Sequence, residues 1–504
     1  MALDIRTPGR RSPGIAGRFP GIRARVAACL AGAVMLAALA GCAGYSAKMV
    51  DLRPQLATGD YVGALKTIDD GAGGHDVLLT WLERGLVLRH AGRFAESNEA
   101  FAAAERTADS LFGRSLAEGA VALLTSDTNV AYRARPYEMA LVPYYKALNY
   151  EDLGQPDEAV VEARRASQVL AKYVDATLGA VREQDRGDLQ KVRNDAFLLW
   201  LSGMLYEADG ELNDAFIAYR NAAVAFEQNA GLLGLEAPAA LAGDLARTAD
   251  RLGFVPELRD AAVASPSVFA DCGDTTADLR TLRAAARGPA GAGELVLMVE
   301  TGYVPPFTQE RIDFPVFKGQ DDEDHERWGW SLWDGRDRWH AAGAGREVEY
   351  WVSVAAPALQ DASVAPYTGV RVSAGTTRGY AVGSRAVDLG RAARVTFDAE
   401  KPTIMVRTIA RGLTKYLATR SAGKLGKGAG FLANLLGAAT EAADTRSWLT
   451  LPRQVHVVRL ALPPGRHDLR LELLGADGRV AREVNLDGVV VRPGAWTFAS
   501  QRIF

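Results

Sequence analysis

The densest group of side chains that could do chemistry lies between Asp321 and His340. This stretch combines four Trp and two His with a run of Asp and Glu. Aromatic faces stack on sugar rings, and two carboxyl groups at a fixed separation cleave glycosidic bonds. The candidate residues for glycan binding are Trp328, Trp330, Trp333 and Trp339. One possible function of the chain, which we keep as the alternative to the scaffold function described below, is therefore binding of peptidoglycan or another glycan through loop 321–340.

An envelope hydrolase built on the same loop is the weakest interpretation. Neither the order nor the spacing of the acids fixes two carboxyl groups at a working distance. We expect instead an acidic surface loop that runs into a Trp-rich hairpin packed on a sheet.

No other stretch matches a catalytic motif. His325-Glu326 lacks the second His four residues on that a zinc protease helix requires. The run Gly423–Gly430 lacks the order of a phosphate-binding loop, and no Gly-x-Ser-x-Gly motif occurs. We predict a protein that is not an enzyme, with no catalytic residue, no metal and no cofactor.

The amino-terminal 41 residues have the order of an export signal. A stretch with six Arg and one Asp precedes an apolar run from Val26 to Leu39. As a helix, that run would extend about 21 Å, which is short of the ~30 Å hydrocarbon core of a bilayer. We therefore predict a removable signal peptide over residues 1–41.

Cys42 is the predicted lipidation site. The order Leu39-Ala40-Gly41-Cys42 fits every position of the bacterial lipobox, in which the Cys thiol is alkylated and the new amino terminus is acylated, for example with palmitate. Several acyl chains anchor a protein stably where a single chain is marginal. Because Ala43, and not Asp, follows the Cys, we expect an outer-membrane lipoprotein that faces the periplasm.

Charge and cysteine content limit the remaining chain. The first 41 residues hold six of the 58 Lys and Arg and one of the 61 Asp and Glu, so the rest carries a net charge near −8. That balance disfavours nucleic-acid binding. Only Cys42 and Cys272 remain after processing. With Cys42 acylated, no intrachain disulfide can form, and packing must provide the stability.

Residues 42–285 show the pattern of tetratricopeptide (TPR) helical hairpins, with small, aromatic and turn-Gly residues at matching positions. One unit consists of Trp81, Gly85, Leu88, Gly92, Phe101 and Ala104, and another of Gly203, Tyr206, Gly210, Ala215, Tyr219 and Ala222. A third keeps the small residues but has Ala where an aromatic is expected: Ala147, Tyr150, Gly154, Ala159, Ala163 and Ala166. The half is therefore a helical array, or a generic helical bundle with close Ala and Gly contacts.

The turn glycines are not evenly spaced. Only Gly59 and Gly92 lie about one repeat apart, whereas Gly154 and Gly210 are displaced. We expect extra helices, at about residues 105–125 and 165–192, and hence an irregular array.

The candidate partner-binding surface lies on two adjacent helices of this array. Its residues are Tyr137, Tyr144, Tyr145, Asn149, Glu162 and Arg165. They could form a polar seam that receives an envelope protein or peptide. The alternative is intramolecular, with tyrosines that pack the hairpin and charges that pair along a helix.

The chain changes character after a Gly, Ala and Pro-rich linker at residues 286–293. Short β-branched and apolar runs follow, and they predict a β-sandwich-like domain over residues 294–504. The expected strands are Glu294–Glu300, Ile312–Phe317, Glu347–Ala355, Gly369–Ser373, Val455–Leu460, Asp468–Leu474, Arg479–Leu486 and Val489–Arg492.

A helical insertion is expected at about residues 402–443. It carries Arg407, Arg411 and Lys415 at four-residue spacing beside an apolar stripe. Such a helix could lie on lipid, but covering an open sheet is the favoured interpretation. The predicted fold class is thus α+β and multidomain, with an irregular TPR-like array followed by a β-sandwich-like domain.

Three stretches resemble a family of proteobacterial lipoproteins that combine a tetratricopeptide-like half with a β-rich half. They are Tyr144–Tyr150, Glu158–Arg165 and Ala443–Pro452, the last accompanied by Arg459 and Leu462–Gly465. The resemblance implies a setting in cell-envelope assembly, beside lipoproteins of the peptidoglycan-synthase activator type. It leaves the activity open. The expected function is that of a periplasmic scaffold, held to the membrane by its lipid and docking another envelope protein.

Overall fold

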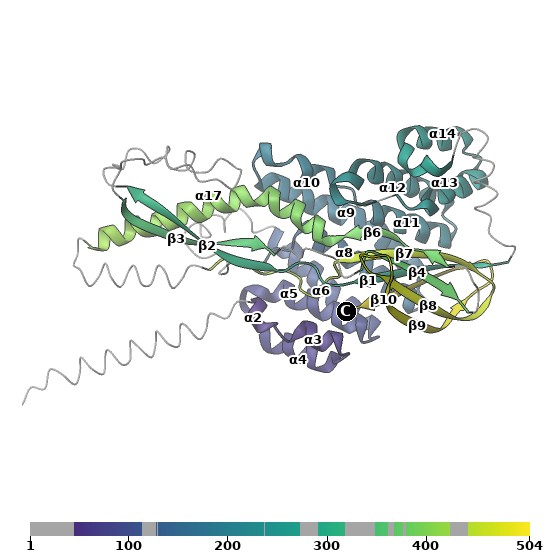
Figure 1. Ribbon diagram of the computed structural model, residues 1–504, viewed down its shortest axis with the longest axis horizontal. Helices are drawn as coiled ribbons and strands as arrows, with labels where there is room; N and C mark the ends of the chain where they lie inside the picture. Colours follow the sequence, from purple (N-terminus) through teal and green to yellow (C-terminus); the bar gives the residue numbers. More distant parts are fainter. Residues whose placement is uncertain are drawn as a thin grey trace, which may run out of the picture. The chain divides into compact units, whose positions relative to one another are not determined.

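The computed structural model describes residues 45–504, except for 113–127, 129, 236, 273–290, 318–347, 361–366, 376–379 and 424–441 (Figure 1). The predicted fold class is confirmed, because helices fill the first part of this chain and strands begin at Gly293. Within the described residues, no helix is both long and apolar enough to span a membrane.

The helical half consists of antiparallel hairpins. α5 packs on α6, α8 on α9 and α11 on α12. The helices are α2 (Tyr45–Lys48), α3 (Leu52–Ala57), α4 (Tyr61–Gly71), α5 (Val77–His90), α6 (Phe94–Phe112), α8 (Pro136–Asp152), α9 (Pro156–Ala180), α10 (Gly187–Lys191), α11 (Ala196–Asp209), α12 (Leu212–Leu233), α13 (Ala239–Leu252) and α14 (Val255–Ala264). Short 3₁₀ turns, including η3 (Glu183–Asp185), join some of them.

The repeat positions behave as their residue types predict. All four turn glycines have positive φ, between 70° and 86°, which favours Gly over residues with a Cβ. Within the hairpins, a Cβ on Gly85 would lie 2.5 Å from the Phe101 ring, and one on Gly203 would clash with Tyr219. The small residues are thus where the paired helices approach most closely.

The irregularity of the array arises differently from the prediction. α6 and α9 are long helices of 19 and 25 residues, so the stretches expected to be separate helices begin as continuations of these two. After α9 the chain forms only η3 and the short α10 before α11 begins at Ala196. Much of the predicted range 105–125 lies outside the described residues.

The β-rich half contains two four-stranded sheets. One has the order β10-β1-β7-β6 and the other β5-β4-β8-β9. The strands are β1 (Gly293–Thr301), β4 (Gly369–Ala374), β5 (Ala381–Val382), β6 (Ser384–Asp388), β7 (Gln454–Leu462), β8 (Gly465–Leu474), β9 (Val480–Val491) and β10 (Trp496–Ile503). β10 was not expected from the sequence, and it pairs in parallel with β1.

Two predicted strands are in fact one. The runs Arg479–Leu486 and Val489–Arg492 both belong to β9, which continues through a register shift opposite Asp468. Gly488 has a φ of 74° there and donates its N–H to the Asp468 carboxylate at 2.8 Å. A Gly at a bulge lets a strand bend without ending.

A separate two-stranded ribbon, β2 (Phe307–Phe317) and β3 (Val348–Leu359), runs beside helix α17 (Leu389–Gly423) in Figure 1. Apolar residues of the ribbon, Phe314, Val352 and Val354, pack on Ile409, Leu413 and Tyr416 of the helix. The helix therefore covers the ribbon. It begins well before the predicted boundary at residue 402, because Pro402 lies inside the helix and does not start it.

The sheet β10-β1-β7-β6 has apolar residues on both faces. Leu295 and Leu297 of β1 point to the second sheet, where they pack with Val370 and Leu471. Their neighbours, including Val296, join the main core together with the helices. Because strand side chains alternate, one strand serves both cores. The helical and β-rich halves thus share one continuous apolar core.

Candidate functional site

Helix α8 supplies most of the predicted partner-binding residues, and all of them are buried. The exposed fraction is 6% for Tyr137, 1% for Tyr144, and 0% for Tyr145 and Asn149. A helix buried around its whole circumference lies inside a protein core. Other parts of the same chain therefore cover the predicted partner-binding residues of α8.

The two adjacent tyrosines contact the β-rich half. The Tyr144 hydroxyl donates a hydrogen bond to Glu300 of β1 at 3.0 Å. The Tyr145 ring stacks on Phe101 and meets the edge of Trp448, with ring centroids 6.0 and 6.1 Å apart. Burial raises the pKa of the Glu300 carboxyl, which lies beside both phenols. These tyrosines join α8 to the sheet.

Asn149 is the centre of a buried polar network. Its amide donates to Ser97 at 2.9 Å and to Asn98 at 2.7 Å, and its oxygen accepts from Arg89 at 2.6 Å. Arg89 also donates to the Ser500 hydroxyl of β10 at 2.7 Å. The network thus runs from α6 through α8 to the edge of the sheet.

Glu162 and Arg165 pair within the array. Glu162 lies 2.5 Å from the Lys146 ammonium and 2.8 Å from the Arg165 guanidinium. Arg165 also reaches Glu105 of α6 at 2.8 Å. Both residues therefore have charged partners within the array, the Arg165 side chain is 38% exposed, and their role in binding a partner stays a prediction.

An extended segment of the chain, Ala443–Arg453, lies along the array and leads into β7. We call it the groove segment. Arg446, Trp448, Thr450 and Leu451 within it are each at most 4% exposed. A non-helical, non-strand segment can be buried in this way only if other groups satisfy its backbone.

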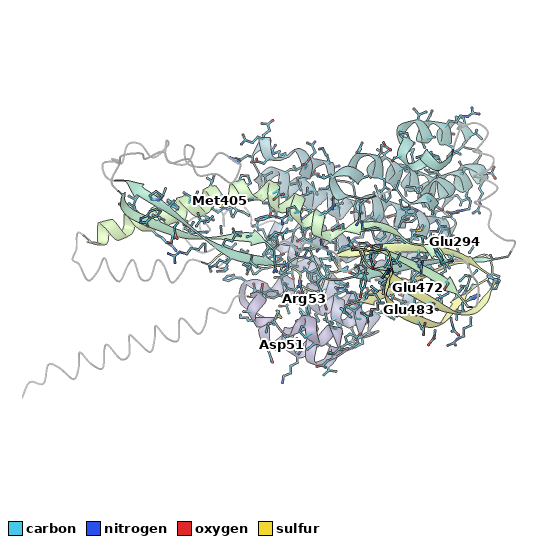
Figure 2. All side chains as sticks on the ribbon, viewed as in Figure 1. Asp51, Arg53, Glu294, Met405, Glu472 and Glu483 are labelled. Carbon is cyan, nitrogen blue, oxygen red and sulfur yellow. The ribbon has the colours of Figure 1, made fainter. Side chains whose placement is uncertain are left out.

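Side chains of the array provide that satisfaction. The backbone N–H of Trp448 donates to the Glu138 carboxylate at 2.8 Å, and the backbone N–H of Leu449 donates to the Glu83 carboxylate at 2.6 Å. Arg53, labelled in Figure 2, donates its Nε–H to the Leu449 carbonyl at 2.8 Å. The Arg135 guanidinium donates to the Arg446 carbonyl at 3.0 Å. The array thus recognises backbone groups of the segment, as a receptor recognises an extended peptide.

The two carboxylates are held by different partners. Glu138 lies in the first turn of α8, and its second oxygen accepts the N–H of Arg135 and the hydroxyl of Tyr132, at 2.8 and 2.6 Å. Glu83 also accepts the Thr450 hydroxyl. Burial raises the pKa of Glu83 to about 7, although its hydrogen bonds and Arg53 act in the opposite direction.

The sequence reasoning missed Glu83, Glu138, Arg53 and Arg89. It quoted the groove segment as part of a resemblance but gave it no role. One signal was present, because Glu83 interrupts the apolar run of α5 on a face that must be buried. A buried carboxylate requires partners, and these come from residues more than 300 positions away.

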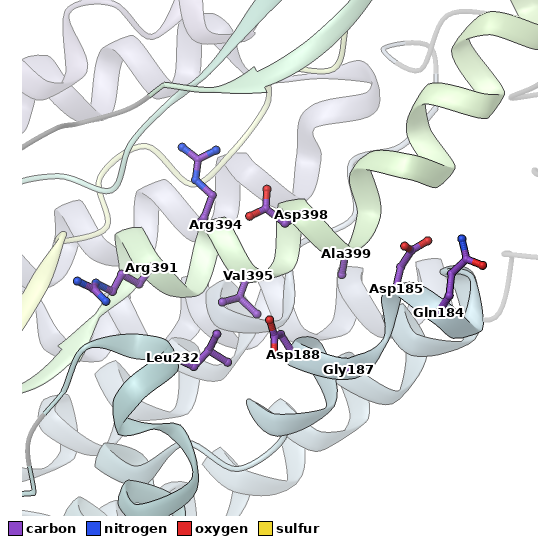
Figure 3. Close-up of a pocket in the computed structure, with 10 residues that line it drawn as sticks. All are labelled: Gln184, Asp185, Gly187, Asp188, Leu232, Arg391, Arg394, Val395, Asp398 and Ala399. Carbon is purple, nitrogen blue, oxygen red and sulfur yellow. The ribbon is translucent and has the colours of Figure 1, made fainter. Parts of the chain in front are cut away.

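A charged pocket of about 590 Å³ lies between α17 and the η3–α10 region (Figure 3). It is lined by Gln184, Asp185, Gly187, Asp188, Leu232, Arg391, Arg394, Val395, Asp398 and Ala399. Asp185 pairs with Arg182, and Asp188 with Lys191, each at 2.7 Å. Asp398, the third acid of the lining, also interacts within the chain, and the lining contains neither Cys nor His.

Several predicted residues lie outside the described part of the chain. They are Cys42 and the four tryptophans of loop 321–340. Among the described residues, no group of three or more His, Cys, Asp or Glu is placed to hold a metal ion. The lipid anchor, the glycan-binding alternative and the absence of catalysis stay predictions.

Comparison with known proteins gives similarity in solved structures alone. No protein-family profile and no curated protein sequence matches the chain. The TPR protein YrrB, described as having an unusual peptide-binding site, is 14% identical with a TM-score of 0.26, over 47% of this chain and 90% of its own. A putative kinesin light chain from Podosopora anserina is 16% identical with a TM-score of 0.27, over 45% and 96%. BtubC from P. vanneervenii is 16% identical with a TM-score of 0.26, over 53% and 88%.

Proposed function

We propose that the protein is a lipid-anchored scaffold of the outer membrane that faces the periplasm and holds another envelope protein during cell-envelope assembly. The observation that supports the proposal is that the helical array binds an extended chain through its backbone, here the groove segment of the same protein. Glu83, Glu138, Arg53 and Arg135 bind backbone groups of an extended chain, which is the chemistry of peptide recognition.

In the folded protein, the groove segment occupies the face of the array that binds extended backbone. A partner of the folded protein must therefore dock on other surfaces of the helices and sheets. Apolar residues exposed on the outer sides of helices include Val62 at 82% and Val161 at 45%. The partner we favour is an envelope protein, such as a lipoprotein of the peptidoglycan-synthase activator type.

The docking proposal is tested by photo-cross-linking in intact cells. A photoreactive amino acid replaces Val62, Val161 or Ile217 in separate variants, and Tyr144 in a control whose side chain is buried. We expect links to one envelope protein from an outer position and none from position 144. Links to other copies of this chain alone, from every outer position, would contradict the scaffold.

The anchor is tested by fractionation of cells that express the native chain or Cys42→Ser. The thioether at Cys42 is the expected membrane attachment, so the native protein should sediment with outer membranes. The variant should lose that association, because a serine at this position has no thiol to carry the diacylglyceryl group. Equal membrane association of both proteins would refute the anchor.

A further inference from the structure

A second pocket, of about 530 Å³, opens at the far end of the α6 and α9 helices from the turn that joins α8 to α9. It is lined by Leu78, Ala108, Leu111, Phe112, Arg133, Ala134, Arg135, Tyr173, Ala176, Thr177, Gly179, Ala180 and Glu400. We call it the Glu400 pocket. Its volume lies in the range of small-molecule sites, and most of its lining is apolar.

Glu400 is the acidic residue in the lining of this pocket. It projects from α17 and makes no hydrogen bond or ion pair with any residue that the structure describes. Burial raises the pKa of its carboxyl, against the attraction of Arg135 and Arg407 and with the repulsion of Glu138 and Asp444. The residue is half-buried, and its carboxyl is open to a ligand in the pocket.

The cations in the lining already have partners. Arg135 donates to the Arg446 carbonyl at 3.0 Å and to the Tyr132 hydroxyl at 3.3 Å, and its guanidinium lies 3.9 Å from the centre of the Phe307 ring. Arg133 is exposed and interacts within the chain. Both arginines thus have partners within the chain, whereas no hydrogen bond or ion pair of the Glu400 carboxyl is present among the described residues.

The apolar wall has an aromatic part beside it. Phe112 and Tyr173 meet edge to face, with ring centroids 5.3 Å apart. Phe112 is 36% exposed, so part of its ring is available to a ligand. The Tyr173 hydroxyl is buried and has no hydrogen-bond partner. The Lys172 ammonium already lies over the Phe112 ring, 4.7 Å from its centre, so these rings offer a ligand apolar surface.

We infer that the Glu400 pocket binds a small molecule that carries a positively charged ammonium group on an apolar body. The ammonium would donate hydrogen bonds to the Glu400 carboxylate, and the body would replace water along the helices α6 and α9. This inference is independent of the proposed scaffold, because none of the surfaces tested by cross-linking belongs to the pocket.

The test uses the full chain in lipid nanodiscs, titrated at neutral pH with three probes of equal length: n-hexylamine, 1-hexanol and hexanoate. Empty nanodiscs, measured in parallel, correct for partition into lipid. We expect hexylamine to bind about tenfold more tightly than hexanol, because a hydrogen bond to a charged group contributes more than a neutral one. Hexanoate should bind most weakly.

Three variants assign the effect to the pocket. Glu400→Gln should lose the advantage of the amine but still bind hexanol, which also shows that the variant is folded. Asp398→Asn removes an exposed carboxylate two residues away on α17 and should bind like the native chain. Ala176→Trp should fill the pocket and weaken all three probes.

The opposite results are equally definite. If hexanoate bound most tightly, the arginines of the lining would determine binding. If hexylamine and hexanol bound with equal affinity, Glu400 would make no contribution to binding. No binding above the empty nanodiscs, or an unchanged preference in Glu400→Gln, would also overturn the inference.

Discussion

The carboxylate of Glu83 accepts the backbone N–H of Leu449 at 2.6 Å, although the two residues are 366 positions apart in the chain. Glu83 lies in α5, the first helix of the α5–α6 hairpin, whereas Leu449 belongs to the groove segment that leads into β7. One side chain of the array thus fixes the segment that leads into β7, an inner strand of the sheet. The helical half and the β-rich half are therefore one folding unit, and the face of the array is part of its interior.

Replacement of Glu138 should be strongly destabilising. Glu138→Ala removes the acceptor of two buried donors, the backbone N–H of Trp448 and the hydroxyl of Tyr132, and of the partly buried backbone N–H of Arg135. We expect a loss of about 3 kcal/mol or more in the free energy of unfolding, measured by urea denaturation. The matched control is Glu158→Ala on α9, where the side chain is exposed, and it should change stability by less than about 0.5 kcal/mol. Equal effects of the two changes would contradict this account.

Gly85→Ala should destabilise the hairpin of α5 and α6 by about 1–3 kcal/mol, because the new methyl group would lie 2.5 Å from the Phe101 ring. Phe101→Leu replaces the ring with a smaller side chain. In the double variant it should therefore recover part of the stability that Gly85→Ala loses. Thermal unfolding of both single variants and the double variant measures that coupling. Gly187→Ala, where a Cβ meets nothing, is the control. Strict additivity would show that the two positions do not touch.

The buried His456 should make the protein sensitive to acid. Burial, with the help of Arg385, lowers the pKa of His456 from 6.5 to about 4, and neither ring nitrogen has a hydrogen-bond partner. The folded state therefore binds the proton less well than the unfolded chain, and stability falls as the pH drops from about 6.5 to about 4. The loss attributable to this group is about 3 kcal/mol. In His456→Phe, urea midpoints over this range should fall less steeply, and parallel profiles would exclude the His as the cause.

Glu83 should have the opposite pH dependence. Its pKa is raised from 4.5 to about 7, so its contribution to stability is full below about 4.5 and is lost as the pH rises through about 7. Relative to the native chain, Glu83→Gln should therefore gain up to about 3 kcal/mol between those pH values. The difference in unfolding free energy between the two proteins, followed across the range, measures this. If the difference in unfolding free energy between the two proteins did not change with pH, the Glu83 carboxyl would not have a raised pKa in the folded protein.

The two halves should not be stable apart. Residues 42–285 alone would expose the apolar face that packs on β1 and the groove segment, and residues 294–504 would expose the matching side of the sheet. We expect the helical half alone to bind a hydrophobic dye and aggregate, and co-expression of both pieces to give a complex that co-purifies. If the helical half alone unfolded cooperatively at the same temperature as the full chain, the two halves would be independent domains.

The sequence by itself determined the local structure. Gly59, Gly92, Gly154 and Gly210 mark turns because only Gly takes positive φ without strain, and Gly85 and Phe101 are complementary because paired helices require a small residue opposite a large one. The strand runs of the β-rich half follow from alternation and branching. These signals are local, since each depends on residues within one hairpin.

Tertiary structure alone decided which surfaces are covered. Tyr144 and Tyr145 carry the same polar groups whether they face solvent or Glu300 and Trp448, and no local pattern distinguishes the two. The role of the groove segment depends on Glu83 and Glu138, hundreds of residues earlier in the chain. Buried carboxylates require partners, but a sequence does not state where the partners come from. That pairing exists only when the two halves fold against each other.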